Sequence, residues 1–194
     1  MDLYAEAIQR FKEEFAKAAT CGLKEPTSMT LATASRDGRT TIRTVLLKSG
    51  DENGFVFYTN LESRKGRDLA ENPRASLCFY WGPLEKQVIV DGNVARVSDA
   101  EADAYWRTRA RDSQIGAWAS QQSRPLGSRT EFLARVAATA AKYAVGAVPR
   151  PPYWSGFRVV PERIEFWKGM PFRLHERVVY EKQGNEWRKS LVYP

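Results

Sequence analysis

The segment from Ile164 to Glu176 carries the side chains of this sequence that are best suited to chemistry. It reads IEFWKGMPFRLHE and contains the single histidine, His175, two residues from Arg173 and two from Arg177. On an extended strand these three side chains project from one face. Positive groups gathered in this way repel one another, so they indicate an anionic or electron-rich ligand. A solvated edge strand with alternating charges is the alternative.

A second candidate site is the start of a short helix expected from about Ser63 to Glu71. Arg64 and Lys65 occupy its first turn, where the positive end of the helix dipole disfavours cations. A bound phosphate would explain them, because the free N–H groups, the dipole and two cations would converge on one anion. Two exposed cations, tolerated at about 0.3–1 kcal/mol each, are the alternative.

A third candidate is formed by residues spaced four apart. Tyr105, Arg109 and Ser113 line one face of a helix if that helix continues through Arg111 and Asp112. All three side chains donate hydrogen bonds, and a guanidinium can bind two oxygens at once, which predicts a second phosphate site. An ordinary surface helix with Tyr105 half-buried is the alternative.

Two further cations flank an apolar run on an expected strand. Arg43 and Lys48 enclose residues 44–47, and we expect the middle of this strand to be buried. A regular strand points the two cations to opposite faces, so they reach one ligand only at different ends or across a bulge. The tryptophans are expected mostly in the core, with one or two free to stack on a flat ring.

The first half of the chain predicts one helix followed by a sheet. Apolar residues recur at helical spacing from Tyr4 to Ala18, which predicts an amphipathic helix that ends near Gly22 and packs on a sheet. Residues 28–97 contain short β-rich runs separated by turns. They predict an antiparallel meander curled into a barrel and interrupted only by the helix at 63–71.

The second half predicts two helices and a return to strands. Ser98 with Glu101 and Ser128 with Glu131 form capping-box patterns. The β pattern returns from FRVV onward, so strands from both ends of the chain are expected to complete one sheet. We therefore predict a single α+β domain over residues 1–194.

Composition restricts the class of protein. Hydrophobic residues make up 43% and charged residues 27% of the 194 residues, a globular balance. The net charge is +7, but lysine and arginine are scattered, which favours several small anion sites over nucleic-acid binding. No apolar run approaches the roughly 20 residues of a membrane span, and the N-terminus is amphipathic rather than signal-like. A cytoplasmic protein is expected.

Cysteine and histidine are too few and too separated for a metal site. Cys21 and Cys78 show no metal-binding spacing, so they are expected to be buried free thiols. With one histidine in the chain, zinc is not expected.

Taken together, these stretches resemble the pyridoxamine 5′-phosphate oxidase family, whose members are FMN-dependent split-barrel dimers. The resemblance extends from about Glu25 to Pro194. Its specific parts are RTVLLK at 43–48, FYTNLESRKG at 57–66, NPRASLCFYW at 72–81, RDSQIGAW at 111–118, and the EFW and RLHER motifs near the C-terminus.

The resemblance implies roles for individual residues. The cofactor FMN would be bound by Arg43, Thr44, Val45, Leu46, Leu47, Lys48, Tyr58, Thr59, Arg64, Lys65, Gln87, Gln122, Ser123, Trp167 and Arg177, partly from a second subunit. The substrate phosphate would lie among Lys48, Tyr105, Arg109 and Ser113. Arg173 and His175 would be the catalytic residues, placed over the pyridine ring.

The implied reaction oxidises pyridoxine or pyridoxamine 5′-phosphate with O2 to pyridoxal 5′-phosphate and hydrogen peroxide. The implied assembly is a homodimer with FMN sites at the subunit interface, and neither nucleic acid nor a membrane is an expected partner. Two departures from the family pattern stand out: the usual longer basic N-terminal arm is missing, and the usual final Arg-Leu-x-Pro is Leu191-Val192-Tyr193-Pro194 here.

Three rival functions follow from the same residues. A related flavin oxidase acting on another ring system, such as those of phenazine biosynthesis, would share the barrel and the LHER motif, but Lys48 and Arg109 favour a phosphorylated substrate. A split-barrel protein could bind FMN without turnover, which Arg173 and His175 disfavour. A basic nucleic-acid-binding domain would show salt-dependent binding and no chromophore.

Overall fold

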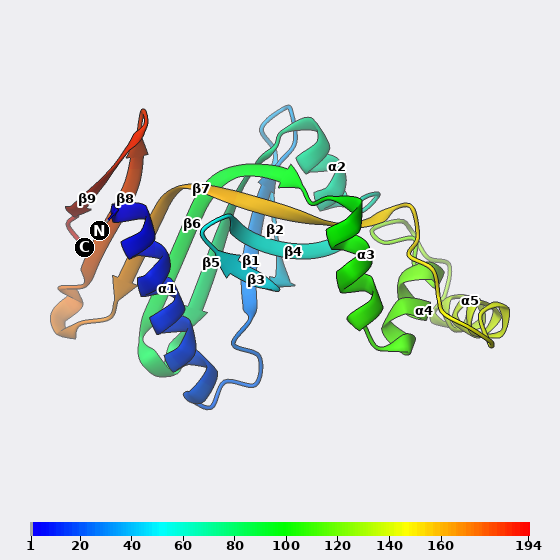
Figure 1. Cartoon of the computed structure of the whole chain (residues 1–194). Coiled ribbons are helices and arrows are strands. Elements are labelled where there is room, and N and C mark those ends of the chain that lie inside the picture. Colours follow the sequence, from blue (N-terminus) through cyan, green and yellow to red (C-terminus); the bar gives the residue numbers. More distant parts are fainter. Residues whose placement is uncertain (1) are drawn as a thin grey trace.

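A computed structural model describes residues 2–194, and its strands form one antiparallel sheet of nine strands (Figure 1). The strands are β1 (Ser28–Ala34), β2 (Thr40–Leu46), β3 (Ser49–Asp51), β4 (Gly54–Asn60), β5 (Arg74–Trp81), β6 (Lys86–Arg96), β7 (Trp154–Lys168), β8 (Glu176–Gln183) and β9 (Glu186–Leu191). The helices are α1 (Leu3–Thr20), α2 (Arg64–Glu71), α3 (Asp99–Thr108), α4 (Arg111–Ala119) and α5 (Arg129–Lys142), with short 3-10 turns η1 (Gly82–Leu84) and η2 (Pro171–Arg173).

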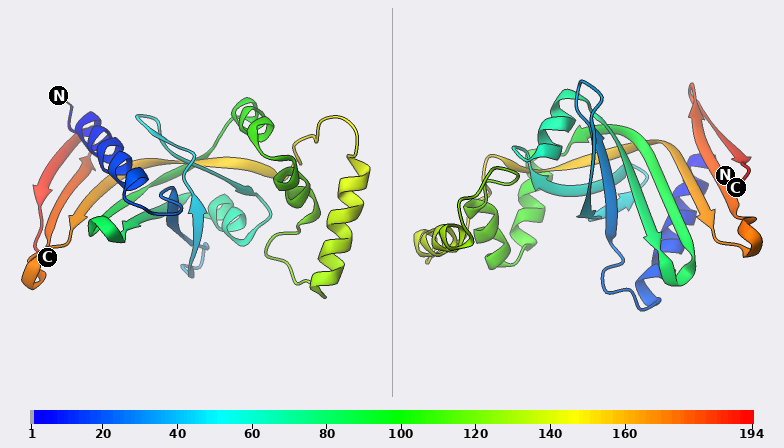
Figure 2. Two further views of the ribbon diagram at one scale, coloured as in Figure 1. Left: turned by 90° about the horizontal axis from the view of Figure 1, so that it is seen from below. Right: turned by 180° about the vertical axis from the view of Figure 1, so that it is seen from behind.

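The sheet runs in the order β2-β1-β5-β6-β7-β4-β3, and β8 and β9 extend it from β7. The 15-residue strand β7 pairs with β4 through residues 154–159 and with β8 through residues 163–168. It therefore connects the part of the molecule that carries α3, α4 and α5 with the part that carries β8 and β9 (Figure 2). The curled sheet with flanking helices confirms the predicted α+β split barrel, and strands from both ends of the chain complete it.

Helix α1 covers the opening of the curled sheet with an aromatic cluster. The ring of Phe11 lies 4.8 Å from that of Phe55 and 5.1 Å from that of Phe79, both nearly edge to face. Trp81 completes the cluster at 6.2 Å from Phe11. Such edge-to-face pairs stabilise a core beyond the area that they bury. The predicted opening helix is confirmed, and it ends at Thr20, with Cys21 as its C-cap, before Gly22 with φ +86°.

A bulge in β7 lies opposite a glycine of β6. The register shifts between Asp91, which pairs with Arg163, and Gly92, which pairs with Pro161, so the ladder skips one residue of β7. A Cβ atom on Gly92 would lie 2.1 Å from the carbonyl oxygen of Val160, which is backbone and cannot move aside. Glycine therefore lets two long strands stay in contact through the bend.

The three predicted helix starts are confirmed by their caps. The hydroxyl of Ser63 accepts a hydrogen bond from the N–H of Gly66 at the start of α2. Ser98 and Ser128 accept from the N–H groups three residues later, at the starts of α3 and α5. These caps fix the point at which each helix begins.

The helix that carries Tyr105 does not continue through Arg111 and Asp112, so the condition for one shared helix face is not met and two helices form instead. Helix α3 ends at Thr108, and Arg109 adopts an extended conformation with ψ 142°. The side-chain amide of Gln114 in α4 donates to the carbonyl of Trp106, which satisfies a group that the helix end leaves free. Arg107 in the last turn of α3 and Asp112 in the first turn of α4 suit the two helix ends.

The strand expected to contain Arg173, His175 and Arg177 was predicted wrongly, because β8 begins only at Glu176. Pro171 has no N–H to donate to the ladder, and Phe172 and Arg173 follow it with φ of 58° and 64°. The N–H of Leu174 donates to the carbonyl of Pro171, which closes a tight turn. The three side chains therefore do not form one strand face.

The predicted burial of residues 44–47 is confirmed only in part. Strand β2 lies at the edge of the sheet, and Thr44 is exposed. Leu47, just beyond the strand, is buried in the core, and Val45 packs against the core while half-buried. The tryptophans agree better with expectation: Trp81, Trp106 and Trp154 are buried, and Trp118 and Trp167 are partly exposed.

Both cysteines are free thiols, half-buried rather than fully buried as expected. Among residues 2–194 none of the helices has the length and apolar character of a membrane-spanning segment. The same residues contain no group of three histidine, cysteine or acidic side chains arranged to bind a metal.

Candidate functional site

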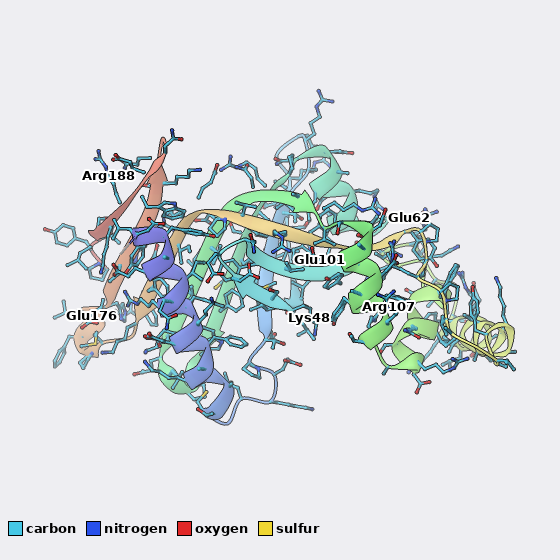
Figure 3. The ribbon with its side chains drawn as sticks, in the orientation of Figure 1. Lys48, Glu62, Glu101, Arg107, Glu176 and Arg188 are labelled. Atoms are coloured by element: carbon cyan, nitrogen blue, oxygen red, sulfur yellow. The ribbon has the colours of Figure 1, made fainter. Side chains whose placement is uncertain are left out.

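A cleft of about 700 Å³ lies where β2, β4 and α2 face α3, α4 and the start of β7. Figure 3 shows Lys48 and Arg107 in this part of the molecule and Glu176 at its other end. The cleft brings together twelve of the predicted site residues: Arg43, Thr44, Val45, Leu46, Lys48, Tyr58, Thr59, Lys65, Tyr105, Arg109, Ser113 and Gln122.

One end of the cleft is built around a buried ammonium group. Lys65 is 8% exposed, and its Nζ lies 3.2 Å from Thr59 Oγ1, 3.2 Å from Ser63 Oγ and 3.4 Å from Gln122 Oε1. All three partners are neutral oxygens. Burial, with the positive charge of Arg43 adding to it, lowers the pKa of Lys65 from 10.5 to about 8. A cation held in this way at the start of α2 favours a bound anion.

Arg43 enters the same end of the cleft from β2. Its Nη1 donates to Thr33 Oγ1 at 2.6 Å, its Nη2 donates to Thr41, and the same Nη2 lies 3.6 Å from a carboxylate oxygen of Asp68. Burial lowers the pKa of Arg43, and Asp68 opposes this change. The guanidinium is therefore fixed in direction before any ligand arrives.

The other end of the cleft is built around Arg109. Its guanidinium lies 4.8 Å from the ring of Trp154 and 5.3 Å from that of Trp106, close enough for cation–π attraction. Within residues 2–194 its buried Nη1 has no hydrogen-bond partner. Burial lowers the pKa of Arg109. A buried donor without a partner is costly, so this atom favours a ligand that accepts a hydrogen bond.

Aromatic rings form the wall between the two ends. Tyr58 stacks on Tyr105 with centroids 4.0 Å apart, and Trp154 lies 5.3 Å from Tyr58 on nearly parallel planes. Burial raises the pKa of Tyr58 to about 12, so its hydroxyl stays protonated. The break between α3 and α4 lets Tyr105, Arg109 and Ser113 line one cleft although they do not share one helix.

Some predicted site residues border this cleft without lining it. Arg64 is exposed at the start of α2, close enough to Arg43 to lower the pKa of that guanidinium further. Leu47 packs into the core, and Ser123 lies with φ 69° in the exposed loop after Gln122. The side chains of Leu47 and Ser123 are not brought to the two cationic ends.

The remaining predicted residues form a separate group on β6, β7 and β8. Gln87 pairs with Trp167, and Trp167 pairs with Arg177, so the three lie in one row across the sheet. The ring of His175 lies 4.8 Å from that of Trp167, and its Nδ1 accepts from the N–H of Met170. Arg173 is exposed in the adjoining turn. We call Gln87, Trp167, Arg173, His175 and Arg177 the strand-end group.

A buried carboxylate holds Arg177 in this row. Glu165 is 3% exposed, and its Oε1 accepts from Arg177 Nε at 2.6 Å, while its Oε2 accepts from Arg163. Burial raises the pKa of Glu165, but the hydrogen bonds from the two arginines lower it overall. The guanidinium of Arg177 is therefore paired within the chain, unlike that of Arg109.

Sequence reasoning missed three residues that line the cleft, namely Thr108, Ala110 and Trp154. Thr108 and Ala110 flank Arg109, so the helix break would have revealed them. The sequence does not mark Trp154 as a site residue, because a tryptophan at the start of a strand is ordinarily expected in the hydrophobic core.

Comparisons with known proteins agree on one family. Residues 15–143 match the family model described as pyridoxamine 5′-phosphate oxidase, and residues 154–194 match the model of a pyridoxine 5′-phosphate oxidase C-terminal dimerisation region. A pyridoxine/pyridoxamine 5′-phosphate oxidase of Rhodospirillum rubrum is 59% identical over 95% of this chain and 94% of its own length. A protein of the same name from Myxococcus xanthus is 57% identical over 97% and 92%.

A solved structure agrees closely in fold. PhzG from Burkholderia lata 383, determined in complex with tetrahydrophenazine-1-carboxylic acid, superimposes with a TM-score of 0.92. It is 36% identical, and the match covers 96% of this chain and 92% of that one.

The geometry of Lys65 predicts that its buried charge lowers the stability of the free protein and strengthens anion binding. Without added anion, we expect Lys65→Met to raise the free energy of unfolding by about 1–3 kcal/mol, because a buried charge with neutral partners is removed. Between pH 8 and 10.5 the unfolded wild type binds more protons than the folded one, so the free energy of unfolding of wild type rises with pH. The stability advantage of Lys65→Met over wild type therefore shrinks across this range. Denaturant titrations at several pH values measure both effects.

Inorganic phosphate should then stabilise wild type more than Lys65→Met, because the variant loses the buried cation at one end of the cleft and retains only the donors around Arg109. The exposed Arg67 on the same helix supplies the control: Arg67→Met removes one positive charge and should keep the full stabilisation. Equal stabilisation of all three proteins by phosphate would contradict this account of the cleft.

Proposed function

The chain belongs to the pyridoxamine 5′-phosphate oxidase family, and we propose that the large cleft and the strand-end group together form its active site. The protein is an FMN-dependent oxidase that converts pyridoxine or pyridoxamine 5′-phosphate to pyridoxal 5′-phosphate with O2, releasing hydrogen peroxide. The observation that carries the site assignment is the pair of anion-seeking cations, Lys65 and Arg109, at the two ends of one cleft.

The donor set of the cleft fits FMN. Lys65, Arg43 and the exposed Arg64 surround the start of α2, where a phosphate monoester would receive charge-assisted hydrogen bonds. The edge strand β2 leaves backbone groups free along residues 43–46, which border the cleft. Thr59 and Gln122 already hold the ammonium of Lys65 in place. These residues would bind the cofactor phosphate and the chain of atoms that follows it.

The donors at the other end of the cleft fit the phosphate of the substrate. Arg109 supplies an unpartnered Nη1, and Tyr105 and Ser113 supply hydroxyl groups beside it. Lys48 adds a cation from the end of β2. Two anion sites in one cleft account for a cofactor and a substrate that each carry a phosphate.

The protein is a homodimer, in line with the dimerisation region matched by residues 154–194. Within one chain the strand-end group lies where β7 ends beside β8, whereas the cleft includes Trp154 at the start of β7. Figure 1 shows these two ends of β7 far apart. We propose that the partner subunit brings its strand-end group to the cleft, so that each active site contains residues of both chains. Exposed apolar side chains on β2 and in the turn before β8, Ile42 and Phe172 among them, support contact between copies.

The chemistry divides between cofactor and protein. When bound, FMN accepts a hydride equivalent from the substrate carbon and passes the electrons on to oxygen. Arg173 and His175 would hold the pyridine ring in position and balance negative charge on it. Because Nδ1 of His175 accepts from the N–H of Met170, the proton of the neutral ring sits on Nε2. His175 is therefore arranged as a hydrogen-bond donor toward the substrate rather than as a strong base.

Oxidation of a phosphate-free tricyclic substrate is the second candidate, favoured by the TM-score of 0.92 to PhzG. The relatives named as vitamin B6 oxidases are far closer in sequence, at 57–59% against 36%. The orphaned donor of Arg109 also requires an acceptor in the cleft. We therefore favour the phosphorylated pyridine substrate.

We further propose that the chain works as a single domain in the cytoplasm. The nine-stranded sheet, which continues from β1 to β9, supports one domain. Two free thiols, Cys21 and Cys78, support a reducing compartment.

The test of this function combines cofactor binding with turnover. The protein is supplemented with FMN, desalted, and mixed with pyridoxamine 5′-phosphate under air while pyridoxal phosphate and peroxide are recorded. Retained flavin with both products supports the proposal. Retained flavin without products, or products only from the tricyclic acid, would overturn the substrate, and loss of all flavin would overturn the cofactor site.

The two ends of the cleft should be separable by mutation. We expect Arg109→Ala to raise KM for pyridoxamine 5′-phosphate about 10- to 100-fold, the value of a lost charge-assisted hydrogen bond, while the Kd of FMN changes little. Activity on unphosphorylated pyridoxamine should be unaffected. The exposed Arg107, two residues earlier, gives the control variant Arg107→Ala. Equal losses of FMN and substrate binding would contradict the separation.

Shared active sites predict that two variants, each strongly impaired at a substrate concentration below KM, restore each other when activity is measured at that concentration. Arg109→Ala alters the cleft and Arg173→Ala the strand-end group, so a mixed dimer has one site with both changes and one site with neither. Co-expressed with distinct tags and allowed to pair at random, the mixture should regain about a quarter of wild-type activity. No recovery in isolated mixed dimers would mean that both residues serve the same chain's site.

A further inference from the structure

Asp68 is a buried carboxylate that joins three elements behind the cationic end of the cleft. It lies on α2, it is 7% exposed, and it does not line the cleft. Its Oδ2 accepts hydrogen bonds from Thr33 Oγ1 on β1 at 2.7 Å and from Thr41 Oγ1 on β2 at 3.0 Å. A buried carboxylate is costly unless it is paired, and here its charged partner is Arg43, at 3.6 Å.

The two threonines connect Asp68 to the guanidinium at both nitrogens. Thr33 Oγ1 accepts from Arg43 Nη1 at 2.6 Å while it donates to Asp68. Thr41 Oγ1 likewise accepts from Arg43 Nη2 while it donates to Asp68. Each hydroxyl thus uses its single proton toward the carboxylate and its lone pair toward the arginine. This arrangement requires an acceptor at position 68 that has no proton to donate.

Asp68 also sets the charge at the end of the cleft. Arg43, Arg64 and Lys65 bring three positive charges together, and Arg43 lowers the pKa of Lys65 while Asp68 raises it. With Asp68 included, the group carries a net formal charge of two. A phosphate monoester carries about −1.5 to −2 near neutral pH, so the charges match.

We propose that Asp68 is a positioning residue for the FMN phosphate: it fixes Arg43 through Thr33 and Thr41 and reduces the charge of the cationic group to that of a phosphate dianion. The inference rests on the proposed function, because the cationic group meets this phosphate only if FMN occupies the cleft. Asp68 does not touch the ligand, and it acts through the cations.

The variant Asp68→Asn keeps the shape of the side chain and removes its charge. Both threonines donate to the same oxygen, Oδ2, and an amide oxygen in that place can accept both hydrogen bonds, so the variant removes the charge and leaves the bridges. We expect the Kd of FMN to rise about tenfold or more, because Arg43 loses its charged partner and Lys65 loses its proton more readily. Riboflavin, which has the same ring system and no phosphate, should bind wild type and variant equally.

The pH dependence gives a readout that a purely structural role would not move. Lys65 faces Arg43 of β2, Thr59 of β4, Ser63 and Asp68 of α2, and Gln122 of the loop after α4. FMN affinity falls as Lys65 loses its proton. Without Asp68 the pKa of Lys65 is lower, so affinity should begin to fall at a lower pH in Asp68→Asn than in wild type.

Flavin fluorescence titrations from pH 6.5 to 9.5, together with unfolding midpoints of the FMN-free proteins, test the proposal. The control is Glu71→Gln, which removes an exposed carboxylate from the end of the same helix. It should change the affinity for neither FMN nor riboflavin. If Asp68→Asn does not fold, Thr41→Val removes one of the two bridges and should weaken FMN several-fold without affecting riboflavin.

The outcomes separate the two proposals. Equal losses for FMN and riboflavin, or no loss for FMN, would overturn the role of Asp68 while leaving the function intact. Failure of wild type to bind FMN at all would instead overturn the proposed function.

Discussion

The cleft depends on positive charge that is buried before its counter-ion arrives. The ammonium of Lys65 has only neutral hydrogen-bond partners. The buried Nη1 of Arg109 has no hydrogen-bond partner among the described residues. Protein groups ordinarily neutralise such charges, and the chain has carboxylates to do so, as Glu165 does for Arg177 and Arg163. Leaving two cations unsatisfied in one cleft destabilises the free protein and strengthens binding of anionic ligands. The fold tolerates this because α1 and the sheet build their aromatic core on the other side.

The second constraint is that one chain does not complete the site. Register across β6, β7 and β8 places Gln87, Trp167 and Arg177 in one row, but that row lies at the opposite end of β7 from the cleft. In the proposed site the long strand separates two half-sites by its length, and a two-fold partner would reunite them because each chain then offers one of each kind. The dimerisation region and the strand-end group occupy the same residues, 154–194, apart from Gln87 on the adjacent strand. Assembly and the proposed catalysis would therefore use the same part of the chain.

The sequence was informative where local chemistry decides the structure and uninformative where distant contacts do. Helix starts at Ser63, Ser98 and Ser128 follow from caps within three residues, and all were predicted. The break at Arg109 depends on Gln114 reaching back to the carbonyl of Trp106, which no periodicity shows. Charge placement marked Arg64 and Lys65 as a candidate anion site, and residue spacing marked Arg109 with its neighbours as another, whereas many other residue roles came from the family resemblance. Asp68 was missed because its partners, Thr33 and Thr41, are brought to it by the sheet.

The turn before β8 shows why the error about Arg173 and His175 matters for mechanism. A strand would have pointed both side chains, and Arg177, to one face, leaving three cations to share one ligand. Instead, two consecutive residues with positive φ turn the chain, Arg177 is committed to Glu165, and His175 packs on Trp167. Left-handed backbone is costly for residues other than glycine, so it persists where the surroundings hold it. Pro171, the bond from Leu174 to its carbonyl, and the bond from Met170 to His175 supply that support. The closed turn thus positions the two residues that we propose as catalytic, and it leaves the side chain of Arg173 exposed for a substrate in the proposed shared site.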